Sequence, residues 1–93
     1  MNYGDNTMLV DEFREEIRIE INAGNIKIET LKKYKQLGID QDTMYSVLES
    51  FRAEMRLKND EETEDMIMDN MDFVCGWCSP HMKIYPEFPY KSY

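Results

Sequence analysis

The chain has 93 residues, with 19 Asp and Glu against 11 Lys and Arg, a formal net charge of −8 and 42% hydrophobic residues. This length allows one domain with one modest core, and the hydrophobic content is too high for a disordered acidic chain. The negative charge argues against unassisted binding to nucleic acid or to an anionic membrane, and no apolar run approaches the roughly 20 residues of a membrane span.

The N-terminal part predicts a loose arm over residues 1–7, followed by a helix from about Met8 that ends at Gly24-Asn25. The arm lacks the basic region and apolar core of a secretion signal, so we expect a cytoplasmic protein with reduced cysteines. The helix would bury one face at helical spacing, formed by Val10, Phe13, Ile17 and Ile21. Alternating isoleucines in its second half also suit a strand, but acids in its early turns favour the helix.

A second helix is predicted from about Ile28 to Leu37. Its lysines lie near the C-terminal end, where the helix dipole favours positive charge, and Gly38 is a natural stop. A third helix, capped by Asp40 or Asp42, would reach about residue 58. Its apolar stripe is nearly ideal: Met44, Val47, Leu48, Phe51 and Met55.

A fourth helix is predicted from about Glu61 to Trp77, and three prolines then forbid a continuous helix in residues 79–93. That C-terminal tail is rich in aromatic residues, and we expect it to lie extended over the helices. The fold prediction is therefore all-α: a single domain over residues 1–93, with a bundle of about four helices in residues 8–78 and a C-terminal strap.

The stretch of residues 60–72 is the most informative part of the chain. It contains seven carboxylates and no Lys or Arg, and the other 80 residues sum to a charge of about −1, so the net charge is local. Like charges at helical spacing repel one another. The segment is either an ordinary solvated face or a surface that attracts a basic partner. Its proposed binding residues are Glu61, Glu62, Glu64, Asp65, Asp69 and Asp72, joined by the tail tyrosines Tyr85, Tyr90 and Tyr93 as exposed aromatic anchors.

The segment with Cys75, Cys78 and His81 allows three interpretations. Redox chemistry needs a thiol of lowered pKa at a helix start, whereas this pair lies at the end of an acidic helix. Structural zinc needs a fourth ligand, which only Asp72 or Glu87 could supply. Two cysteines that pack as small hydrophobic residues are the favoured interpretation. We therefore predict no metal and no cofactor, and with a single His no catalytic triad can be built.

Residues 31–48 resemble a helix-turn-helix unit, because the Leu-Gly-Ile turn, Met44 and Val47 fall at the spacing of that family. The resemblance implies DNA binding. However, Tyr34 stands where the family has a small residue. The second helix opens without the cations that phosphate contacts need, offering instead Gln41, Asp42, Tyr45 and Glu49. A small DNA-binding regulator is accordingly the alternative function.

In its size, its acidity and its all-α character the whole chain is similar to bacterial immunity proteins of toxin–immunity pairs, of the colicin and contact-dependent inhibition types. This resemblance implies a protein without enzymatic activity that binds a cognate toxin, usually a basic nuclease domain. The expected partner is thus a basic protein, not nucleic acid and not a membrane, and the sequence assigns no oligomeric state.

Overall fold

All regular structure in the part of the chain that the computed structural model describes, residues 3–76 and 83–85, is α-helical. The four helices are α1 (Tyr3–Asn22), α2 (Ile28–Leu37), α3 (Gln41–Leu57) and α4 (Glu61–Cys75). The all-α prediction with four helices is therefore confirmed.

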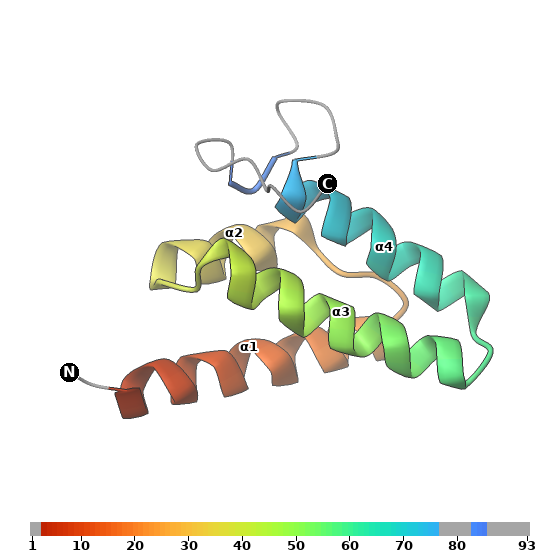
Figure 1. The fold of residues 1–93 in the computed structure, drawn as a ribbon, viewed down its shortest axis with the longest axis horizontal. Coiled ribbons are helices and arrows are strands. Elements are labelled where there is room, and N and C mark those ends of the chain that lie inside the picture. The colour runs from red at the N-terminus through yellow and green to blue at the C-terminus, as the bar shows by residue number, and fades with distance from the viewer. Residues whose placement is uncertain (1–2, 77–82, 86–93) are drawn as a thin grey trace.

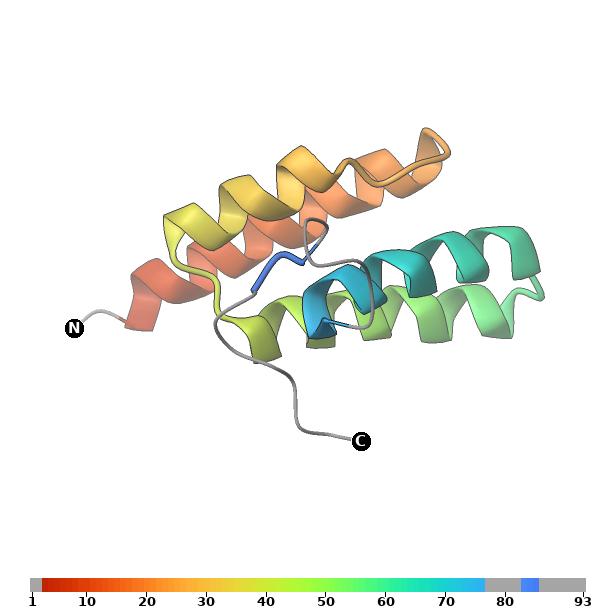
Figure 2. The same cartoon turned by 90° about the horizontal axis from the view of Figure 1, so that it is seen from above.

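The chain runs back and forth along one direction (Figures 1 and 2). α1 and α2 form one antiparallel pair, and α3 and α4 form a second pair beside it. α3 and α4 are in close contact along their length, and α3 also contacts α1. The outer surface of α4 thus lies on the side of the molecule away from α1.

The helix ends follow local chemistry. The Asp40 carboxylate accepts a hydrogen bond from the Thr43 backbone N–H at 2.8 Å, and Asp60 does the same for Thr63 at 3.2 Å. α2 ends at Gly38, whose φ of 118° is open to glycine and strained for other residues. The predicted stop at Gly38 and the predicted cap at Asp40 are confirmed.

Two predicted boundaries are wrong. α1 begins at Tyr3, so residues 3–7 belong to the helix rather than to a loose arm. This stretch contains no proline, and Asp5 lies in the first turn, where the helix dipole favours an acid. α4 ends at Cys75, before the predicted Trp77, because Gly76 adopts a left-handed conformation with φ of 91°.

The core draws apolar side chains from every helix and from the segment 83–85. The third-helix stripe is buried as predicted, whereas Leu37 is exposed and Val10 is only partly buried. The largest side chains with almost no solvent exposure are Phe13, Ile17, Leu31, Met44, Leu48 and Ile67. One core spans both helix pairs, so α4 is held in a fixed orientation.

The segment 83–85 straps α4 to the turn between α2 and α3. The Ile84 N–H donates to the Phe73 carbonyl oxygen at 2.9 Å, and the Tyr85 hydroxyl donates to the Ile39 carbonyl oxygen. Ile84 and Tyr85 are both buried, and Figure 2 shows the segment crossing between α2 and α4. The strap prediction is confirmed for these three residues; the rest of the tail lies outside the described residues.

Candidate functional site: the outer face of α4

Five carboxylates line the solvent face of α4. We call this set the acidic stripe: Glu61, Glu62, Asp65, Asp69 and Asp72, all of them exposed. At about 100° of rotation per residue they fall within roughly 100° of the helix circumference, opposite the buried Ile67 and Val74. Helix geometry therefore concentrates these charges on one surface.

The acidic stripe has no counter-charge within residues 3–76 and 83–85, since none of the ion pairs there includes one of its five members. Many other acids of the chain are used internally: Glu16 binds Lys33, and Glu54 binds Lys58. Partial burial, together with the carboxylate of Asp69, raises the pKa of Asp72 above its usual range. The stripe thus holds mutual repulsion that no ion pair among the described residues offsets.

Glu64, also predicted as a partner-binding residue, does not belong to this exposed set, and its part in partner binding stays a prediction. Its carboxylate lies 3.2 Å from the Arg52 guanidinium of α3, with a side-chain exposure of 16%. Arg52 also binds Glu49 through two hydrogen bonds, and these carboxylates raise the pKa of Arg52. This ion pair holds α4 against α3, so Glu64 has a structural role.

Tyr85 was predicted as an exposed anchor, and this is wrong. The side chain is buried with 4% exposure, its hydroxyl donates to the backbone of Ile39, and the Lys35 ammonium lies 5.2 Å from its ring centroid. Tyr85 fills the core beneath the strap. Tyr90 and Tyr93 lie outside the described residues, so their prediction as anchors stays open.

Two depressions flank the acidic stripe. On one side, a groove of about 360 Å³ lies between α4 and the connection from α1 to α2, with Asp69 at its edge. On the other side, a depression of about 260 Å³ lies between α3 and α4, lined by Tyr45, Met68 and Asp72 among others. Met68 is 44% exposed. The flanks of the stripe therefore combine apolar and aromatic side chains with charged ones, Glu49 and Arg52 among them.

Cys75 is buried with 3% exposure, in agreement with the prediction of a packing role. Its thiol contacts the Asp72 carbonyl oxygen at 3.8 Å. Cys78 and His81 lie outside the described residues. Among the residues that the structure describes, no three His, Cys, Asp or Glu side chains gather into a group that could hold a metal ion. The described residues therefore leave the zinc interpretation untested.

The helix-turn-helix segment is used internally at both of its helices. Tyr34 of α2 is buried against Phe13, with ring centroids 5.0 Å apart, and its hydroxyl donates to Glu16 at 2.8 Å. At the start of α3 the Gln41 side chain donates to the Val74 carbonyl oxygen at 2.9 Å. The residue that departs from the family is thus a core residue, and Gln41 is held against α4.

The sequence prediction missed Asn70 and Arg52. Asn70 is buried at 4% exposure on the inner side of α4. A signal was available, because Asn70 lies three residues after Ile67 and four before Val74, on the apolar face. The pairing of Arg52 with Glu64 depends on how α3 and α4 pack, which helix spacing alone does not give.

Comparisons with protein-family models, with curated proteins and with solved structures find no match for this chain. Within the described residues, none of the helices combines the length and the apolar character needed to cross a membrane. Function must therefore be argued from the surface of α4 itself.

Proposed function

We propose that this chain is a binding protein without enzymatic activity, whose acidic stripe captures a basic protein partner. The immunity proteins it resembles suggest a cytoplasmic inhibitor of a toxin nuclease domain. The observation that carries the proposal is the alignment of five exposed carboxylates on one face of α4, without a counter-charge in the described residues.

The chain keeps this repulsion although it satisfies other acids well. Glu20 accepts hydrogen bonds from the Lys27 N–H and the Thr30 hydroxyl, and Asp40 and Asp60 cap helices. A row of unpaired carboxylates does not help a helix fold, because like charges at helical spacing destabilise it. It does create a negative potential that speeds encounter with a positively charged protein.

The competing function, a DNA-binding regulator built on residues 31–48, has weaker support. Phosphate contacts need exposed cations, and Lys33 of α2 is engaged with Glu16 at 3.0 Å. Gln41, at the N-terminal end of α3, is held by Val74. The negative stripe on the neighbouring helix would oppose the approach of a polyanion.

The proposal is tested by affinity capture with three baits of the full chain. One is unchanged, one neutralises the stripe (Glu62→Gln, Asp65→Asn, Asp69→Asn), and one neutralises exposed acids of α1 (Asp11→Asn, Glu12→Gln, Glu15→Gln). Both variants change the net charge by the same amount, and the α1 variant additionally removes the exposed ion pair of Glu15 with Arg18. We expect the unchanged bait and the α1 variant to retain one basic protein that the stripe variant loses. Equal retention by all three baits would refute the proposal.

A further inference from the structure

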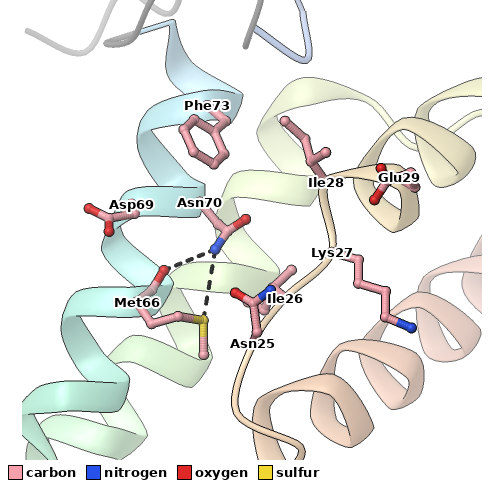
Figure 3. Close-up of a pocket in the computed structure, with 9 residues that line it drawn as sticks. All are labelled: Asn25, Ile26, Lys27, Ile28, Glu29, Met66, Asp69, Asn70 and Phe73. Atoms are coloured by element: carbon pink, nitrogen blue, oxygen red, sulfur yellow. Dashed lines mark hydrogen bonds between the residues drawn. The ribbon is translucent and has the colours of Figure 1, made fainter.

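The groove beside the acidic stripe contains an unusual polar group. One wall is the part of α4 with Met66, Asn70 and Phe73, and the other is the segment 25–29, which joins the α1–α2 connection to the first turn of α2 (Figure 3). Ile26 in that segment is buried. The groove, of about 360 Å³, has mixed apolar and polar walls, as small-ligand and side-chain pockets commonly do.

Asn70 has an acceptor without a donor. Its Nδ2 donates to the Met66 carbonyl oxygen at 2.9 Å, while its Oδ1 is out of contact with solvent and has no hydrogen-bond partner among the described residues. If Oδ1 and Nδ2 were exchanged, Oδ1 would face the Met66 carbonyl oxygen, and two acceptors cannot form a hydrogen bond. The orientation of the Asn70 amide is therefore determined. Figure 3 shows Oδ1 directed away from α4 toward the segment 25–29. Such buried, unsatisfied acceptors are rare in folded proteins.

The surroundings of Oδ1 favour a cationic donor. Asp69 and Glu29 both line the groove, and Figure 3 shows the Asp69 carboxylate directed away from the segment 25–29, toward the solvent side of α4. Lys27 also lines the groove, but Figure 3 shows its ammonium group directed toward α1. A positively charged group would therefore be drawn to this place by the same field that attracts the partner.

The aromatic and aliphatic walls favour a guanidinium over an ammonium group. Arginine presents five N–H donors in a plane, is more weakly hydrated than lysine, and stacks on aromatic faces. Phe73 is half-buried at the groove and offers such a face. Met66, also half-buried, places its flexible thioether 3.8 Å from Asn70 Nδ2, on the side of the amide away from Oδ1.

We propose that this groove binds an arginine side chain of the basic partner. The guanidinium donates to Asn70 Oδ1 and lies against the Phe73 ring. The inference rests on the proposed function for the source of the arginine, whereas the site itself can be tested without the partner.

The probe is the peptide acetyl-Gly-Arg-Gly-amide, titrated into the ¹⁵N-labelled full chain and followed by NMR. We expect shifts in the Asn70 side-chain amide and in the backbone amides of residues 25–29 and 66–73. A citrulline peptide of the same shape without the charge should bind at least about fivefold more weakly, because charge-assisted hydrogen bonds are roughly twice as strong as neutral ones. A lysine peptide should also bind more weakly than the arginine peptide.

Variants of the groove separate the site from general electrostatics. Asn70→Leu should weaken the arginine peptide by about tenfold, because it removes the acceptor, and it should fold because it replaces an unsatisfied polar group by an apolar one of similar size. Phe73→Leu should weaken it by about threefold through the lost ring. The matched control Glu62→Gln, on the stripe away from the groove, should change the dissociation constant by less than about twofold.

The inference is overturned if Asn70→Leu binds the arginine peptide unchanged, if citrulline binds equally well, or if the shifts are confined to residues 61–65. Should Asn70→Leu not fold, the citrulline comparison and Phe73→Leu decide. With the captured partner, normal affinity of Asn70→Leu would refute the arginine site and leave the stripe proposal standing. Normal affinity of the stripe variant would refute the proposed function alone.

Discussion

Glu20 is the buried charge whose removal tests the energetics of this fold most clearly. The residue is 7% exposed in α1, and its carboxylate accepts from the Lys27 N–H at 2.8 Å and from the Thr30 hydroxyl at 2.5 Å. Lys27 is the N-cap residue of α2 and forms no side-chain cap of its own. Glu20 thus supplies, from another helix, the acceptor and the negative charge that the start of α2 needs.

The expected effect follows from these contacts. Hydrogen bonds to a charged group contribute about 1.5–3 kcal/mol each, and removing the acceptor leaves buried donors unsatisfied. We expect Glu20→Ala to lower the free energy of unfolding by about 2–4 kcal/mol, which for a domain of this size lowers the melting temperature by roughly 10–20 °C. Glu20→Gln keeps the shape and some hydrogen bonding, so the loss should be about 1 kcal/mol.

The assay is urea unfolding followed by circular dichroism, with Glu12→Ala, an exposed acid of the same helix, as the control. That control should change stability by less than about 0.5 kcal/mol. A double-mutant cycle with Thr30→Val should reveal coupling between Glu20 and Thr30. The reasoning is refuted if Glu20→Ala matches the control, which would mean that the desolvation of the carboxylate cancels its hydrogen bonds.

Three further predictions concern pH, surface charge and DNA. Burial and the hydrogen bond to Glu16 raise the pKa of Tyr34 to about 12, so its contribution to stability is complete below pH 10 and is lost as the pH rises toward 12. Tyr34→Phe should flatten the stability decline over that range, measured by urea unfolding, and an unchanged slope would contradict this. The pKa of Asp72 is raised, so its ionised form opposes folding at neutral pH. The double variant Asp69→Asn with Asp72→Asn should therefore raise the free energy of unfolding by a few tenths of a kcal/mol at pH 7 and by less at pH 3. A loss of stability at pH 7 would show that these carboxylates support the fold. Random duplex DNA should show no binding at about 0.15 M salt, where non-specific binders have dissociation constants of about 10⁻⁴–10⁻⁶ M; nanomolar binding to a selected site would favour the helix-turn-helix alternative.

The sequence predicted the helices well because their signals are local. The apolar spacing, the stop at Gly38 and the cap at Asp40 each depend on residues within a few positions of one another. The start of α1 was missed because residues 3–7 contain neither a strong signal for a helix nor a strong helix breaker. A residue that can cap a helix can also lie inside one, so the first residue of a helix is hard to predict from sequence.

The parts of the site that were missed depend on tertiary packing. The sequence around Tyr85 carries no sign that this side chain is buried, because its burial depends on the path of the strap. Glu64 lies outside the arc of the acidic stripe, which the helix spacing could have shown, but its ion pair with Arg52 of another helix depends on packing. The periodicity of α4 did predict which side would be apolar, and with it the exposed position of the stripe.

The measurement that tests the central claim most directly is the association rate with the captured basic partner as a function of salt. At low ionic strength the stripe variant (Glu62→Gln, Asp65→Asn, Asp69→Asn) should associate at least about tenfold more slowly than the unchanged chain, and the difference should shrink as salt rises toward 0.5 M. The α1 variant of equal net charge should stay within about twofold of the unchanged chain. Association rates that are the same for both variants, or that ignore salt, would contradict a binding function for the acidic stripe of α4.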